Sequence, residues 1–426
     1  MTADLVKLQR DTYAYFLELT NEDNGLVPDN SRVGSHCSIA AVGFGLATLP
    51  VAVERGFVSR AHATRRVLAA LRFFRDAPHD GARDSTGYRG FYFHFLDMER
   101  GRRAWRCELS TIDSAFLFAG MLACATYFDR DTPYEREIRE TAEELYARAD
   151  WDWACDGGVV VSHGWRPERG FIPYGWTGYN EALLLLILGL GSPSHSLPAE
   201  AWAEWTRTYR WKKLYGQEHV YGGPLFVHQL SHAWIDFRGI QDDYMRYRGI
   251  DYFENSRRAT YVQREHAIHN PRQLRGFGED VWGVTAGDGP GPARRTVDGR
   301  ERRFYGYRAR GVPWGRNDGT IAPWSVAASL PFAPEIALPA VEIMRVRYPQ
   351  LAGAYGLKSA FNPTFEVSGS PGGWVSDRYY GIEQGPAVLM IENHLTGFFW
   401  ELMKRCPHVV RGLKRAGFRG GWLGEG

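Results

Sequence analysis

The stretch STIDSAFLFAGMLACATY, residues 110–127, is apolar on nearly every side. A helix of this kind has to be buried all round, because it offers water no polar face. Other stretches share this character: residues 38–53 and 182–190. The segments that alternate with them each carry one polar face: residues 61–75, 135–150 and 198–212. The sequence therefore predicts buried helices that alternate with helices that cover them.

This alternation predicts an all-α fold, an (α/α)6 toroid with two concentric rings of six helices, built as a single domain over residues 1–426. An irregular helical protein or a solenoid is the alternative, but no fixed sequence period is visible. No run of alternating strand pattern appears, which disfavours α/β folds. The expected helices cover about residues 3–20, 38–55, 59–76, 110–128, 133–150, 180–190, 198–212, 229–246, 250–266, 323–330, 335–348, 384–404 and 407–416.

The composition excludes several classes of protein. Hydrophobic residues make up 44% of the chain and the formal net charge is +2, so nothing suggests a nucleic-acid or membrane partner. The five cysteines are widely spaced without a CxxC motif, which makes structural zinc or a disulfide framework unexpected. The 15 Trp and 22 Tyr exceed what a core needs, and flat aromatic faces suit sugar rings. Nothing in the sequence indicates an oligomeric state.

The first residues, MTADLVKLQRD, lack the basic-then-apolar pattern of a signal peptide. We therefore expect a cytoplasmic protein, or a periplasmic one if a leader was removed from the sequence. The longest apolar runs, residues 38–53 and 183–190, are too short to form a transmembrane helix.

Two carboxylates, Glu108 and Asp113, lie at the start of the apolar stretch 110–127. Ser110 and Asp113 resemble a capping box, which is the structural explanation for Asp113. Capping does not explain Glu108, because it lies outside the helix. Paired carboxylates at the mouth of a buried helix also suit glycosidic chemistry.

A third carboxylate, Glu181, stands directly before the apolar run LLLLILGLG. Asn180 is a plausible N-cap, which places Glu181 in the first helical turn, where the dipole favours negative charge. Burial raises a carboxyl pKa and the dipole lowers it, and a general acid needs the first effect to be larger.

His228, His232 and Asp236 fall four residues apart, on one face of the expected helix 229–246. That spacing is compatible with a metal site, but a polar stripe facing a sugar pocket explains it equally, and there is no HExxH motif. We expect no metal and no cofactor. The long connection 285–323, with Asp298-Gly299 as a hairpin turn, is expected to be functional. No P-loop, GxSxG or dinucleotide fingerprint is present.

Several blocks resemble one family: GFYFHFLD (90–97), ELSTIDSAFLFAG (108–120), GYNEA (178–182), HQLSHAWIDFRGIQD (228–242), GIDYFENSRRAT (249–260), DGTIAP (318–323) and SLPFAPE (329–335). They are similar to the bacterial glucoamylase-like proteins. These include glycoside hydrolase family 144, the β-1,2-glucanases, and the transglycosylase domain of cyclic β-1,2-glucan synthases. The resemblance runs from about residue 5 to 423 and implies an (α/α)6 barrel without a cofactor, acting on β-1,2-glucan.

By the same resemblance, Glu181 is the general acid, and Glu108 or Asp113 is the base or nucleophile. Hydrolysis with inversion is the expected outcome, which requires carboxyl groups roughly 6.5–9.5 Å apart, whereas about 5–5.5 Å indicates retention. A retaining transglycosylase and a non-catalytic glucan-binding protein are the alternatives. Glu383 departs from the family pattern, which has Asp there. The expected substrate-binding residues are Asp97, Trp176, Tyr179, Asn180, His228, His232, Asp236, Arg238, Gln241, Asp242, Arg257, Glu279, Trp282, Asp318 and Glu383.

Overall fold

Buried and covering helices alternate along the first half of the chain. The computed structural model describes residues 2–424. The helices buried on nearly every side are α2 (Ile39–Glu54), α4 (Thr111–Tyr127) and α6 (Leu183–Gly191). The helices that bury one face and expose the other are α3 (Arg60–Asp76), α5 (Pro133–Ala147) and α7 (Glu200–Arg207). The predicted burial of the three apolar stretches is confirmed.

Hydroxyl side chains cap the first turns of α2, α4 and α5. The Ser38 Oγ atom accepts an N–H group from the first turn of α2. The Ser110 Oγ atom accepts the N–H of Asp113 at 3.2 Å at the start of α4, so the predicted cap is confirmed. Thr132 does the same for α5, whose first position is a proline. Each of these contacts satisfies a backbone donor that has no partner within the helix.

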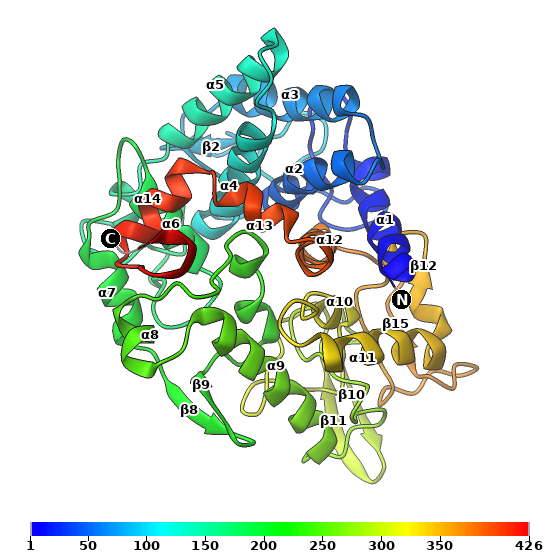
Figure 1. Cartoon of the computed structure of the whole chain (residues 1–426). Coiled ribbons are helices and arrows are strands. Elements are labelled where there is room, and N and C mark those ends of the chain that lie inside the picture. Colours follow the sequence, from blue (N-terminus) through cyan, green and yellow to red (C-terminus); the bar gives the residue numbers. More distant parts are fainter. Residues whose placement is uncertain (1, 425–426) are drawn as a thin grey trace.

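The chain makes one circuit of the molecule, as the colours of Figure 1 show, from α1 on the right over the top and down the left side. At the end of the circuit, α12 (Gly381–Leu395) packs against both α1 (Thr2–Leu19) and α2. The C-terminal helix α14 (Pro407–Arg415) packs against α6. The remaining helices and 3-10 turns are α8 (Asp243–Arg248), α9 (Tyr252–His269), α10 (Pro323–Ala327), α11 (Pro334–Arg347), α13 (Phe398–Met403), η1 (Trp153–Cys155), η2 (Leu225–His228), η3 (Ser231–Ala233), η4 (Pro349–Leu351) and η5 (Gly421–Leu423).

Helix α2 meets both of its buried neighbours through glycine. A Cβ atom added at Gly120 of α4 would lie 2.1 Å from the carbonyl oxygen of Gly43, and one added at Gly43 would lie 2.2 Å from that of Phe116. On the α12 side, a Cβ atom at Gly385 would lie 2.3 Å from the Cβ atom of Phe44. No side chain fits at these positions, so the spacing of α2, α4 and α12 depends on them.

Strands within residues 2–424 are short and form groups of two or three. Strand β8 (Trp211–Leu214), paired with β9 (Gln217–Val220), replaces the end of the predicted helix 198–212. Strands β10 (Ala293–Val297) and β11 (Arg300–Phe304) flank Asp298-Gly299, both with positive φ, which confirms the predicted hairpin turn. The others are β1 (Cys37–Ser38), β2 (Gly87–Tyr88), β3 (Phe91–Tyr92), β4 (Phe95–Leu96), β5 (Leu109–Ser110), β6 (Gly164–Arg166), β7 (Gly170–Phe171), β12 (Ala352–Gly353), β13 (Gly356–Leu357), β14 (Phe361–Asn362) and β15 (Trp374–Val375).

The predicted helix 229–246 is wrong. The segment contains the turn η3, a stretch without regular structure, and then α8. Its polar side chains bond to other elements: the Gln229 Nε2 atom donates to the Ser325 carbonyl, and the Ser231 Oγ atom accepts the N–H of Leu184. Gly239 has a positive φ of 73°, which ends any helical path. His228, His232 and Asp236 therefore do not share a helical face.

Two findings bear on the environment of the chain. In residues 2–424, no helix has the length and apolar content needed to cross a membrane. Each of the five cysteines is buried with a free thiol.

Candidate active site

A cavity of about 530 Å³ lies where the N-terminal ends of buried helices meet. Ser38 precedes α2, Asp113 is in the first turn of α4, Glu181 lies two residues before the start of α6, and Glu383 is in the first turn of α12. The positive ends of helix dipoles favour negative charge, so this position suits carboxylates. The lining residues are Asp29, Asn30, Ser38, His94, Phe95, Ile112, Asp113, Phe116, Glu181, Phe226, Leu230, Ala286, Tyr307, Ala309, Trp324, Tyr380, Ile382 and Glu383.

Glu181 lies in the turn before α6, because the helix begins at Leu183 and not at Asn180 as predicted. The Asn180 side chain accepts the Ala182 N–H at 3.0 Å, and Ser231 Oγ donates to the Glu181 carbonyl at 3.2 Å. These contacts fix the turn that carries the carboxyl group. Burial raises the pKa of Glu181 to about 7, and the negative charge of Asp113 adds to the effect. Glu181 is thus a carboxyl that holds its proton near neutral pH.

Asp113 and Glu108 lie on opposite sides of His94. The Nε2 atom of His94 is 3.5 Å from Asp113 Oδ2, and its Nδ1 atom is 2.9 Å from Glu108 Oε1. Burial opposes a charged ring, but the two carboxylates outweigh it and raise the pKa of His94 to about 9. Ser110 also donates a hydrogen bond from its hydroxyl to Asp113. Asp113 lines the cavity, whereas Glu108 does not.

Glu108 is held by two cationic groups. Its second oxygen is 3.2 Å from the guanidinium of Arg166. The hydrogen bond from His94, against the opposing effect of burial, lowers the pKa of Glu108 to about 2. Glu108 is therefore a fixed negative charge beside the His94 nitrogen that does not face Asp113. It influences the cavity through its contact with the His94 ring.

Glu383 also lines the cavity and is fully buried in the first turn of α12. Ser359 Oγ donates to its Oε1 atom at 3.0 Å, and Tyr307 also interacts with the carboxyl group. Burial, with the nearby Asp288 and Asp29, raises the pKa of Glu383 well above its ordinary value.

The sequence analysis missed Asp29, which also lines the cavity. Its side chain accepts a hydrogen bond from Asn30 at 3.0 Å. Burial raises the pKa of Asp29, and His94 partly offsets the rise. The only signal in the sequence is the Pro28-Asp29-Asn30 turn composition, which is common in loops that have no catalytic role.

Aromatic rings form much of the cavity wall. His94 and Phe95 are stacked with ring centroids 3.9 Å apart, and Tyr307 lies against Tyr380 at 4.6 Å. The Trp324 indole N–H donates to the Ala286 carbonyl at 3.1 Å, and both residues line the cavity. Flat apolar faces beside carboxyl groups fit a pyranose ring, whose faces are apolar and whose edge is polar.

The aromatic residues predicted near Glu181 are packing residues of the wall behind it. Trp176 is stacked on His163 at 3.9 Å, and its indole N–H donates to Thr111 at 3.0 Å. Tyr179 lies parallel to Tyr252 at 6.0 Å. Neither Trp176 nor Tyr179 contributes to the cavity lining.

His228, His232 and Asp236 do not converge on one point. His228 Nε2 donates to the Gly222 carbonyl, and His232 Nε2 is bonded to Ser256. Burial lowers the pKa of both histidines, that of His232 to about 3. Asp236 is buried between Arg238 and Lys404, which lower its pKa against the effect of burial. Among the described residues, no group of three or more His, Cys, Asp or Glu side chains is arranged to hold a metal.

The other side chains predicted to bind substrate lie outside the cavity lining. Asp318 forms an ion pair with Arg310 at 2.8 Å, and both side chains are completely buried. The rest have these contacts: Asp97 accepts loop N–H groups, Gln241 donates to the Ile250 carbonyl, Asp242 caps α8, Arg257 pairs with Glu335, Glu279 pairs with Arg264, and Trp282 packs in the core.

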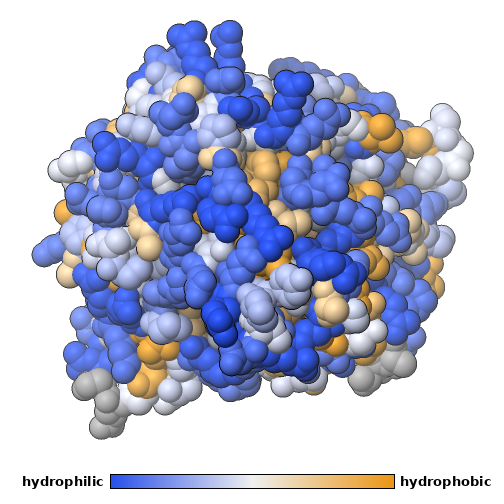
Figure 2. Space-filling model, turned by 90° about the horizontal axis from the view of Figure 1, so that it is seen from above, coloured by the Kyte–Doolittle hydropathy of each residue, from blue (hydrophilic) through white to orange (hydrophobic). Residues whose placement is uncertain are grey.

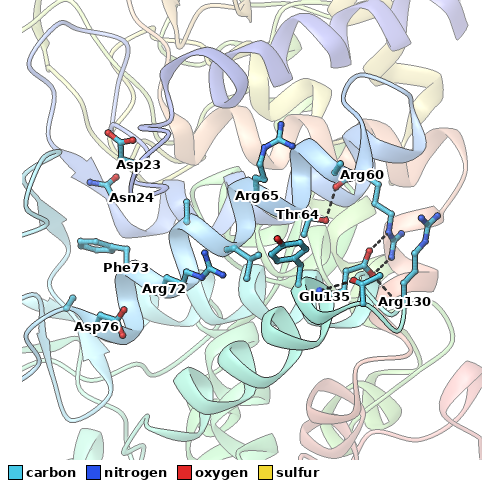
Figure 3. A pocket seen from close by; sticks show the side chains of 16 residues that line it. Asp23, Asn24, Arg60, Thr64, Arg65, Arg72, Phe73, Asp76, Arg130 and Glu135 are labelled. Carbon is cyan, nitrogen blue, oxygen red and sulfur yellow. Dashed lines mark hydrogen bonds and ion pairs between the residues drawn. The ribbon is translucent and has the colours of Figure 1, made fainter.

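A larger hollow of about 1030 Å³ lies on the outside, between α3 and α5. Figure 3 shows Arg60 bonded to Glu135 on its wall, with both contacts 2.8 Å long. Figure 2 views this side of the molecule, which is largely hydrophilic with an apolar strip near the middle. The larger hollow contains no carboxyl group whose pKa is raised. The smaller cavity is therefore the candidate active site.

The chain is similar in sequence and in structure to several known proteins. The model of the Glycoamylase family, described as "Putative glucoamylase", matches residues 173–407. A crystal structure with the same description, from Bacteroides uniformis, is 31% identical with a TM-score of 0.87, and the match covers 99% of each chain. An endo-β-1,2-glucanase from Chitinophaga pinensis, in complex with sophorotriose and glucose, is 26% identical with a TM-score of 0.84 over 98% of each chain.

One curated relative is longer than this chain. It is an exo β-1,2-glucooligosaccharide sophorohydrolase (non-reducing end) from Parabacteroides distasonis, 27% identical over 96% of this chain. The chain spans 57% of that relative's length. Because the family model covers more than half of the chain and the Bacteroides uniformis protein matches almost all of it, the chain belongs to the Glycoamylase family.

Proposed function

We propose that this protein is a glycoside hydrolase that cleaves β-1,2-glucan, with Glu181 as the general acid. The observation that carries the proposal is the cavity, which brings together Glu181, Asp113, Glu383 and aromatic walls. Glycosidic cleavage needs one carboxyl group that protonates the leaving oxygen and a second that activates water or attacks carbon.

Glu181 meets the requirement for the acid. A general acid works best when its pKa lies near the working pH, because it must hold a proton and then release it. The pKa of Glu181, about 7, satisfies both conditions. Burial also raises the pKa of Glu383 well above its ordinary value, and a carboxyl group with that shift suits a hydrogen bond to a sugar hydroxyl.

Asp113 is our choice for the second carboxylate. It lines the same cavity as Glu181, and the two groups interact electrostatically. Its hydrogen bond from Ser110 and the charged His94 beside it fix its orientation. Glu108, which the sequence left as an equal candidate, is outside the lining and acts by positioning His94.

The substrate class rests on the relatives. Proteins 26% and 27% identical to this chain act on β-1,2-linked glucose chains, according to their names. The same similarity supports the finer architecture: we propose six helix pairs in an (α/α)6 toroid and one catalytic domain over residues 1–426. Water is the proposed acceptor, and inversion the proposed stereochemical course.

Product analysis on linear β-1,2-glucan tests the proposal. We expect short sophorooligosaccharides to accumulate, with no products from β-1,3-glucan, β-1,4-glucan or starch. Proton NMR of the first product gives its anomeric configuration. Redistributed chain lengths without net hydrolysis would identify a transglycosylase instead. An unchanged polymer would refute catalysis on this substrate.

A further inference from the structure

Trp105 is an exposed tryptophan beside the cavity that the proposed chemistry does not use. Two thirds of its surface, 67%, is open to solvent. Its ring contacts His36, at a centroid distance of 4.3 Å, and Phe95, at 5.1 Å. Phe95 lines the cavity and is stacked on His94. Trp105 is therefore one ring removed from the cavity wall.

The backbone at Trp105 adopts a conformation that non-glycine residues rarely take. Its φ is 51°, and that of the next residue, Arg106, is 53°. Consecutive left-handed residues with side chains cost conformational free energy, which the surrounding structure has to supply. The exposed side chain of Trp105 recovers little of this free energy through packing, because most of its surface is in water.

Arg103 holds this turn in place from below. Its side chain is completely buried and forms an ion pair with Glu168 at 2.8 Å. The same guanidinium donates to the carbonyl of Cys107 at 2.6 Å and to that of Arg106 at 2.9 Å. Because this buried cation donates hydrogen bonds to the carbonyl groups of the two residues after Trp105, it keeps the turn rigid. The contacts of Arg103 thus hold Trp105 in its strained backbone conformation.

We propose that Trp105 is a stacking platform for a glucosyl ring of the substrate outside the cavity. This inference rests on the proposed function. An exposed indole face is flat and apolar, which matches the apolar face of a pyranose. A rigid platform loses little conformational entropy when a sugar binds. The exposed Arg106 beside it supplies hydrogen-bond donors for sugar hydroxyls.

Kinetics on long and short β-1,2-glucans with Trp105→Asn tests the platform. Asparagine tolerates the left-handed backbone, so the turn is kept while the ring is removed. We expect KM for the polymer to rise about fivefold to tenfold, equivalent to roughly 1–1.4 kcal/mol, with kcat unchanged. Turnover of the shortest cleaved oligosaccharide should not change. Trp105→Phe, which retains a ring, should recover part of the lost affinity.

Trp314→Asn is the matched control, because Trp314 is 62% exposed but its ring contacts Tyr221, which does not line the cavity. It should leave KM for the polymer unaltered. An equal KM for wild type and Trp105→Asn, with normal cleavage, overturns the platform and leaves the proposed function intact. If the wild type cleaves nothing, the proposed function fails. In that case, electrophoresis in gels that contain β-1,2-glucan or another glucan tests the platform. Loss of retardation in Trp105→Asn supports the platform, and equal mobility of wild type and variant refutes it.

Discussion

The Nε2 atom of His94 lies 3.5 Å from the Oδ2 atom of Asp113. Because Glu108 contacts the other ring nitrogen, one imidazole joins two carboxylates that belong to the same sequence motif. Burial alone would discharge the ring, yet the two negative groups raise the pKa of His94 to about 9. At neutral pH the cavity therefore contains a fixed positive charge next to the proposed base.

This charge predicts a pH-dependent contribution to stability. The pKa of His94 is higher in the folded protein, about 9, than its ordinary value of 6.5. The stabilisation is therefore complete below pH 6.5 and disappears as the pH rises through 9. We expect it to reach about 2–3 kcal/mol. Urea unfolding at pH 6 and pH 9.5 should show wild type losing more stability than His94→Gln. Equal losses would refute the coupling.

Replacing Glu181 with Gln should lower turnover on β-1,2-glucan by about 10²–10⁴-fold, because the proton for the leaving oxygen is removed. A substrate with an activated leaving group should lose less. Glu140→Gln is the control, since Glu140 is exposed on α5 and lies outside the cavity lining. Turnover and melting temperature should be measured on both variants. Near-wild-type turnover in Glu181→Gln would end its assignment as the acid.

The pH profile should report the same group. Glu181 acts as an acid only while protonated, so kcat/KM should fall as the pH rises through about 7, the pKa of Glu181. In Glu181→Gln this alkaline limb should be absent from the residual activity. A profile whose alkaline limb is the same in wild type and variant would assign the limb to another residue.

Asp113→Asn should reduce kcat by about 10²–10⁴-fold if Asp113 activates the water. Glu108→Gln removes a group that orients and charges His94 but does not line the cavity, so we expect a smaller loss than in Asp113→Asn. Glu99→Gln, an exposed acid on a nearby loop, serves as the control. The measurement is initial rate on saturating β-1,2-glucan. A greater loss in Glu383→Gln than in Asp113→Asn would transfer the base role to Glu383.

Arg310→Met should destabilise the protein by about 3–5 kcal/mol, because it leaves the buried Asp318 without its partner. The exposed pair of Arg294 and Glu301 offers a control, and Arg294→Met should change stability by less than about 1 kcal/mol. Urea unfolding measures both. If Asp318→Asn instead raises KM without lowering stability, the original prediction that Asp318 binds substrate is the better one.

The buried helices were predictable because their signal is local. Nothing in residues 110–127 or 182–190 offers a polar face, so burial follows directly from the sequence. The segment 228–242 misled the prediction for a physical reason. Its polar residues occur at helical spacing, but their partners, such as Ser325 for Gln229 and Ser256 for His232, lie far away in the chain.

The cavity was only partly predictable, since it is assembled from distant segments. Asp113, Glu181 and Glu383 were found because each stands beside an apolar helix start. Asp29 is in a loop without a hydrophobic pattern, and nothing local distinguishes it from an ordinary turn residue. The exposed Trp105 was also missed, because its contact with the cavity-lining Phe95 comes from the fold and leaves no pattern in the sequence.

The close glycine contacts between α2, α4 and α12 make the site sensitive to mutations at positions that the substrate does not contact. Helices α4 and α12 carry Asp113 and Glu383, so any residue that pushes them away from α2 also separates the two acids. In a library of random variants screened for turnover, Gly43, Gly120 and Gly385 should accept fewer replacements than most residues of the cavity rim. Attempts to reshape the specificity of the proposed site should therefore leave those glycines fixed and vary the loops.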